Sequence, residues 1–286
     1  MKQNASWKIA LALSAGGIAL GTGVWTYWEN RHPDITRYRI LSARLPEEFD
    51  GIKIVQISDL HQFHLGTNQS RLIDAVKKEK PDLIAITGDL FDPDHDGENA
   101  FDLLRGIRDF APVYYVLGNH EARINNLPDF LKKAEEYGVI LLRNRSVCLS
   151  KGHSALRIAG IDDPSFRKSK KSPESGRVKE FLKKIRDDSG KDFYTVLLSH
   201  RPEHFELYCE EKIDLVLSGH THGGQFRLPF LGALYVPYQG ILPKYANGPF
   251  QKGRTTEIIS RGLGCSHIPF RFNNPPELCV ITLVHE

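Results

Sequence analysis

Eight side chains able to bind metal ions or to transfer protons lie in five short segments of this 286-residue chain. Each segment follows an apolar run rich in β-branched residues. Imidazole and carboxylate groups together suit zinc, manganese or iron, whereas calcium takes oxygen ligands alone. The residue types therefore predict a site for divalent transition-metal ions. The eight residues are Asp59, His61, Asp89, Asn119, His120, His200, His220 and His222.

The spacing within two of the segments supports a shared site. Asp59 and His61 are separated by one residue, as are His220 and His222. Alternate side chains of an extended chain lie on one face, so each pair directs two donors the same way. Either pair alone is a weak signal, but the order of all five segments is improbable by chance. Glycines at 88, 118 and 219 permit the tight turns and close approach that such a site needs.

The elements that must position these donors can be read from the apolar runs. The runs IKIVQIS, DLIAITG, VYYVLG, YTVLLS and DLVLS predict buried strands of the parallel type. Helical patterns follow the first three runs, and this alternation favours an α/β fold. Ligands of open α/β sheets bind beyond the carboxyl ends of the strands. The five strand ends are therefore expected to meet at one place.

The pattern changes after Gly223, where GGQFRLPFLGALYVP, TTEIISRGLG and LCVITLV are typical of antiparallel strands. We therefore predict an α/β fold with two mixed β-sheets packed face to face and helices on the outer faces, a four-layer αββα sandwich. Residues 1–30 are predicted to form an N-terminal tail and membrane anchor, 31–49 a linker and edge strand, and 50–286 the domain that carries the site.

The N-terminal anchor is predicted from residues 9–28, which carry no charge and are about as long as a bilayer-spanning helix. Trp25, Tyr27 and Trp28 end this stretch, and aromatic residues favour the membrane interface. The stretch predicts one transmembrane helix and a location at the cell membrane. A cleaved signal peptide and a buried core helix are the alternatives. Basic residues precede and follow the stretch, so the side of the membrane stays open.

Composition and missing motifs exclude several classes of protein. Lys and Arg number 38 against 35 acidic residues, and a net charge of +3 does not indicate a nucleic-acid-binding protein. The four cysteines are scattered and form no C-x-x-C pair, which argues against a zinc ribbon or a disulfide scaffold. The chain has no P-loop and no G-x-S-x-G motif. A basic stretch at residues 166–180 is interpreted as a solvated loop.

The ordered segments SDLH, TGDLFD, GNHE, LSH and SGHTHGGQ resemble those of the calcineurin-like metallophosphoesterase superfamily. The later segments GGQFRLPFLG, PKYANG, SRGLG and PFRFNNPPE are similar to a bacterial branch with an N-terminal membrane segment. The resemblance covers roughly residues 50–284. It implies two divalent ions and one catalytic histidine. By resemblance, Asp59, His61 and His222 hold one ion, Asn119, His200 and His220 hold the other, Asp89 bridges them, and His120 is the catalytic residue.

The implied reaction is hydrolysis of a phosphomonoester, phosphodiester or pyrophosphate bond by a metal-bridging hydroxide, with His120 protonating the departing alkoxide. The branch also suggests lipid-linked substrates, and we expect a monomer. The alternative is a non-catalytic scaffold of the same fold that binds protein partners. Such a scaffold is expected to have lost some of the metal-binding residues, and this chain keeps all of them. Asp92 and Glu121 either orient the site residues or cap helices, capping being the simpler interpretation.

Overall fold

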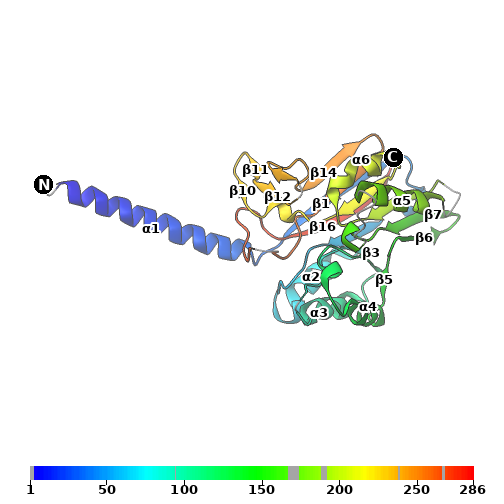
Figure 1. Ribbon diagram of the computed structural model, residues 1–286, viewed down its shortest axis with the longest axis horizontal. Coiled ribbons are helices and arrows are strands. Elements are labelled where there is room, and N and C mark those ends of the chain that lie inside the picture. Colours follow the sequence, from blue (N-terminus) through cyan, green and yellow to red (C-terminus); the bar gives the residue numbers. More distant parts are fainter. Residues whose placement is uncertain (1–2, 94, 167–173, 188–191, 238, 266–267) are drawn as a thin grey trace.

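The computed structural model describes residues 3–93, 95–166, 174–187, 192–237, 239–265 and 268–286 and contains two six-stranded mixed sheets (Figure 1). The strands of the first sheet, in spatial order, are β1 (Asp34–Ser42), β16 (Glu277–His285), β2 (Lys53–Ile57), β3 (Leu83–Thr87), β4 (Val113–Val116) and β5 (Val139–Leu141). In this sheet β2 to β5 run parallel, and β16 pairs antiparallel with β2 and parallel with β1.

The second sheet has four central parallel strands and an antiparallel strand at each edge. Its strands, in spatial order, are β14 (Gly248–Lys252), β15 (Thr255–Ile259), β9 (Leu215–Ser218), β8 (Tyr194–Leu198), β7 (Ser154–Gly160) and β6 (Arg145–Lys151). Four very short strands form two separate hairpins, β10 (Arg227–Leu228) with β11 (Gly232–Ala233) and β12 (Tyr235–Val236) with β13 (Gly240–Ile241).

The two sheets share one core and each packs helices on its other face. Neighbouring residues of one strand enter different cores, because side chains alternate across a sheet. Ile54 of β2 packs between the sheets with Val196 of β8, whereas Val55 packs against the helices with Leu104. Both faces of the central strands are therefore buried, which explains their uninterrupted apolar runs.

The helices on the first sheet are α2 (Ser70–Glu79), α3 (Glu98–Ile107) and α4 (Leu127–Glu136), and those on the second are α5 (Glu174–Asp187) and α6 (Phe205–Glu210) (Figure 1). Short 3-10 helices occupy connections, namely η1 (Glu47–Phe49), η2 (Thr67–Gln69), η3 (Glu121–Arg123), η4 (Pro164–Phe166), η5 (Pro202–His204) and η6 (His222–Gly224). The basic stretch predicted at 166–180 falls partly outside the described residues, at 167–173.

The prediction of a transmembrane helix is wrong. The N-terminal residues do form a helix, α1 (Gln3–Glu29), which extends away from the sheets (Figure 1). Within the described ranges, however, no helix combines the length and the apolar character that crossing a bilayer requires. The prediction rested on the length of the stretch, its lack of charge and the aromatic residues at its end. Glycines at 16, 17, 21 and 23, with Ser14 and Thr22, contribute little apolar surface to this stretch.

Candidate metal centre

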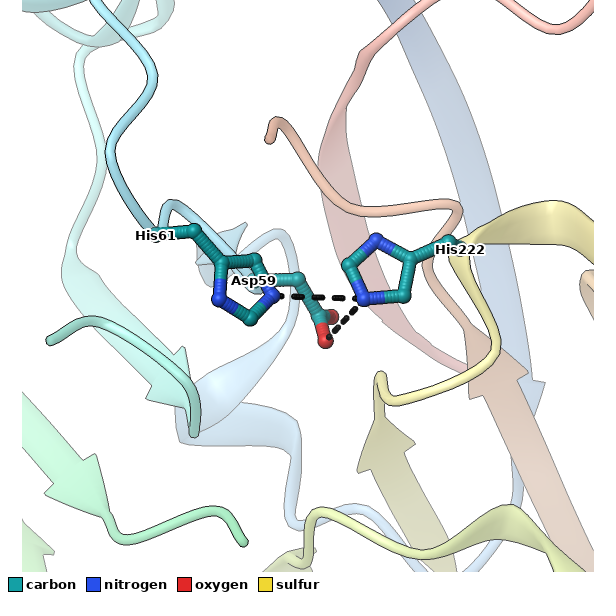
Figure 2. Close-up of side chains that lie close together, drawn as sticks. All are labelled: Asp59, His61 and His222. Carbon is teal, nitrogen blue, oxygen red and sulfur yellow. Dashed lines mark hydrogen bonds and ion pairs between the residues drawn. The ribbon is translucent and has the colours of Figure 1, made fainter. Parts of the chain in front are cut away.

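The five predicted strands end at the same edge of the two sheets, and their donors meet there. The first group contains Asp59 and His61, which follow β2, and His222, which follows β9. His61 Nε2 lies 3.2 Å from His222 Nε2, and His222 Nε2 lies 3.5 Å from Asp59 Oδ1 (Figure 2). Residues more than 160 positions apart in the sequence thus face one another across a space suited to one ion.

The second group lies around His200, which follows β8. Its Nε2 atom is 3.2 Å from Asn119 Oδ1, 3.2 Å from His220 Nδ1 and 3.2 Å from Asp89 Oδ2. Asn119 follows β4, and Asp89 follows β3. This second set of donors therefore draws on strands from both sheets.

Asp89 lies between the two groups. Its Oδ2 atom is 3.2 Å from His200 Nε2 and 3.8 Å from His61 Nε2, so one carboxylate reaches both sets of rings. Its Oδ1 atom accepts a 2.8 Å hydrogen bond from the backbone N–H of His120. Asp89 is 1% exposed, and a carboxylate so deeply buried needs a positive charge nearby.

The hydrogen bonds of the histidine rings show which atoms face the centre. The Nδ1–H groups donate to acceptors behind the rings: His61 to Asp92 Oδ1 at 2.8 Å, His200 to the Thr87 carbonyl at 2.8 Å, and His222 to the Gly264 carbonyl at 3.2 Å. The Nε2 atoms therefore point inward, toward one another and toward carboxylate oxygens. Once these rings have lost the Nε2 proton, their lone pairs converge on one space, where a cation would bind them. The donor set thus fits divalent metal ions.

The pKa values of the buried histidines are shifted in opposite directions. Burial and the charge of His61 lower the pKa of His222 well below its usual value, and burial and Arg201 do the same for His220. Burial also disfavours a charged His200, but Asp89 outweighs burial and raises the pKa of His200 to about 10. A metal ion must therefore displace a proton from the His200 ring.

The backbone at the donors is strained. Five of the predicted ligands have positive φ, a conformation uncommon outside glycine that concentrates at functional sites. The φ values are 51° at Asp59, 50° at His61, 49° at Asp89, 71° at His220 and 50° at His222.

Two glycines allow the strand ends to approach each other. Gly88 has φ of 94°, and a Cβ there would overlap the His200 ring. A Cβ on Gly118 would overlap the Asp89 carboxylate. Both positions therefore require the absence of a side chain.

Glu121 anchors the loops that carry the donors and does not act as a simple helix cap. Its buried carboxylate accepts five hydrogen bonds: Oε1 accepts from Leu90 N at 2.7 Å, Phe91 N at 3.0 Å and Tyr115 Oη at 2.7 Å, and Oε2 accepts from Asp89 N at 3.0 Å and Gly118 N at 2.8 Å. It ties the chain after β3 to the chain after β4. The capping interpretation missed this because most donors come from a different segment.

Asp92 also orients site residues. Its Oδ1 atom accepts from His120 Nδ1 at 2.6 Å as well as from His61 Nδ1. Burial raises the pKa of Asp92, but the hydrogen bonds from His120 and His61 outweigh it and keep the carboxyl ionised. His120 Nε2 lies 3.9 Å from Asp89 Oδ2, so its outer nitrogen faces the centre. One carboxylate thus fixes both a predicted ligand and the predicted acid.

Other residues that the sequence left unassigned have structural roles here. The guanidinium of Arg271 is fully buried and donates hydrogen bonds to the carbonyls of Gly264 and Arg261. The Gly264 carbonyl also accepts the hydrogen bond from His222 Nδ1. Asp163 Oδ2 forms an ion pair with Arg201 Nε at a distance of 2.5 Å. His222 and Gly264 are 42 residues apart and Asp163 and Arg201 are 38 apart, and no local pattern signals such contacts.

A cavity of about 850 Å³ opens onto the donors. Asp89, Asn119, His120, His220 and His222 line it together with a set of apolar residues that the sequence did not single out. Those are Phe226, Leu234, Tyr235, Pro237 and Ile268, named below the apolar wall.

Comparison with known proteins points in the same direction. The family model described as calcineurin-like phosphoesterase matches residues 52–224. The chain is 33% identical over 279 residues to the uncharacterized metallophosphoesterase YkuE of Bacillus subtilis, covering 95% of this chain and 92% of that protein. It is 31% identical to an uncharacterized metallophosphoesterase of Aquifex aeolicus, covering 93% and 97%. It is 27% identical to the phosphodiesterase YaeI of Escherichia coli, covering 92% and 93%.

Proposed function

Since this chain belongs to the calcineurin-like phosphoesterase family and is a metal-dependent hydrolase of phosphoesters, we propose that it works with two divalent ions bound between the strand ends. The ligand types suit manganese, iron or zinc. The observation that carries the proposal is Asp89 Oδ2, which reaches the ring nitrogens of both donor groups. In the proposed arrangement, Asp59, His61 and His222 hold one ion, Asn119, His200 and His220 hold the other, and Asp89 bridges them.

When bound, such ions would polarise the phosphoryl oxygens and lower the pKa of water to provide a nucleophile. The chain itself supplies orientation and a proton. Asp92 accepts the Nδ1–H of His120 and holds the ring in place. His120 Nε2, on the cavity side, donates a proton to the departing alkoxide as the P–O bond breaks, a step worth about 10²–10⁴-fold in rate.

The proposed substrates are phosphomonoesters, phosphodiesters and pyrophosphates, including lipid-linked ones. The cavity supports esters larger than phosphate alone, because about 850 Å³ falls within the usual range for sites that enclose whole organic ligands. All proposed ligands come from one chain, so the site is complete in a monomer.

The proposal is tested by stripping the protein of metal with a chelator and reloading it with manganese, iron or zinc. Hydrolysis of bis(4-nitrophenyl) phosphate should disappear and return with metal. His120→Ala should lower kcat by about 10²-fold or more while metal content is kept. His153→Ala is the matched control, because His153 is exposed in the turn between β6 and β7. Full turnover after stripping would overturn the proposal, and no turnover with any metal would favour a scaffold.

A further inference from the structure

We propose that the apolar wall is a subsite for a hydrophobic group attached to the substrate phosphate. The enzyme would then select phosphoesters of apolar alcohols over esters of small polar ones. This inference rests on the proposed function, because it takes the metal centre as the place where the phosphate binds.

The first support is that wall and metal centre share one cavity. The predicted ligands Asn119 and His222 line it together with Phe226 and Ile268. A volume of about 850 Å³ exceeds what a phosphate group fills. A phosphate bound at the donors would therefore leave room beside the wall for a substituent.

The second support is that the wall is fixed relative to the donors. It begins four residues after His222, where Phe226 O accepts a hydrogen bond from Leu234 N at 3.1 Å. Leu234 O in turn accepts from Leu242 N at 3.0 Å, beyond β13. The Phe226 ring packs edge-on against Phe270, with centroids 5.4 Å apart. Backbone hydrogen bonds and ring packing thus hold the wall next to His222.

The third support is that the wall leaves apolar surface in water. Tyr235 is 56% exposed and Ile268 40% exposed, although the sheets nearby bury nearly all of their apolar side chains. Concave apolar surface beside converging polar groups is the usual form of a small-molecule site. Covering it with an apolar substituent would release water and favour binding.

The hairpins also offer a matched control. Tyr235 in β12 lies opposite Ile241 in β13, and both side chains are largely exposed. Tyr235 lines the cavity, whereas Ile241, 81% exposed, is not among its lining residues. Tyr235→Ser and Ile241→Ser therefore remove similar apolar surface from one hairpin, but only the first changes the wall. Tyr235→Phe keeps the ring and removes the hydroxyl.

The test measures competitive inhibition of bis(4-nitrophenyl) phosphate hydrolysis by the manganese-loaded protein. The inhibitors are methylphosphonate and hexylphosphonate, which present the same phosphonate group with a short or a long apolar chain. Each methylene buried against the wall should tighten binding about threefold to fourfold. We expect hexylphosphonate to inhibit at least about tenfold more tightly than methylphosphonate, because part of the chain stays in water.

The measured quantity is the inhibition constant of methylphosphonate divided by that of hexylphosphonate. In Tyr235→Ser this ratio should fall at least about threefold, whereas Tyr235→Phe and Ile241→Ser should keep it. The inhibition constant of methylphosphonate in each variant reports whether the metal centre is intact. A ratio near one in the unchanged protein would overturn the inference. An equal fall of the ratio in Ile241→Ser would also overturn it, because the preference for the longer alkyl chain would then reflect adsorption to exposed apolar surface. Absence of metal-dependent hydrolysis would instead refute the proposed function.

Discussion

Glu121 should be essential for the stability of the centre, although it is not a predicted ligand. In Glu121→Gln one carboxylate oxygen becomes an NH2 group. The remaining oxygen is best placed at Oε1, where three donors converge, so the NH2 group would face the N–H groups of Asp89 and Gly118. Both groups would then be buried without an acceptor.

Each buried polar group left unsatisfied costs about 1–3 kcal/mol. Two such groups give a loss of about 2–6 kcal/mol in the free energy of unfolding, a large part of the total of about 5–15 kcal/mol for a typical protein. Tyr115→Phe, which removes one of the five donors, should cost only about 1 kcal/mol.

The assay is urea unfolding of the metal-free protein, followed by titration with manganese. Glu136→Gln in α4 is the control, because Glu136 is exposed. The reasoning is refuted if Glu121→Gln unfolds within about 0.5 kcal/mol of the unchanged protein, the range typical of surface substitutions.

Three further predictions concern the donors. Asp92→Asn should lower metal affinity or kcat about 10–100-fold, because the hydrogen-bond acceptor shared by His61 and His120 loses its charge. Asp74→Asn, a change of an exposed aspartate, should leave both quantities unchanged. Gly118→Ala should reduce the amount of bound metal, measured by elemental analysis, because the new Cβ would overlap the Asp89 carboxylate. Gly17→Ala is the control and should bind the normal amount of metal, because the space around Gly17 is open. Metal affinity should rise with pH between 6.5 and 8.5, by about tenfold per unit for each proton displaced, because the His200 pKa of about 10 keeps that ring protonated without metal. A flat profile in metal titrations would contradict the pKa argument.

The sequence was informative where a residue's role follows from its own segment. Donors that follow buried apolar runs, such as Asp89 after β3 and His200 after β8, could be placed because parallel strands end at a common edge. The mixed α/β sheets follow from the same runs. The insertion of β16 between β1 and β2 could not be predicted, because no local pattern specifies which distant strand pairs with which.

Roles that depend on distant partners were missed for the same reason. The ring of His222 donates to the carbonyl of Gly264, 42 residues away, and Arg271 donates to that same carbonyl. The apolar wall comes from residues 226–237, around two hairpins whose sequence indicates only short antiparallel strands, and from Ile268 in the connection before β16. The transmembrane prediction failed because it treated a stretch with four glycines between residues 16 and 23 as if it were uniformly apolar.

We have proposed that two divalent ions bind between the strand ends and that Asp89 bridges them. This proposal is tested most directly by a crystal structure of the manganese-loaded protein with anomalous diffraction data. We expect two anomalous peaks about 3.5–4 Å apart, one beside Asp59, His61 and His222 and the other beside Asn119, His200 and His220, with the Asp89 carboxylate between them. A single peak, or peaks away from these residues, would contradict it.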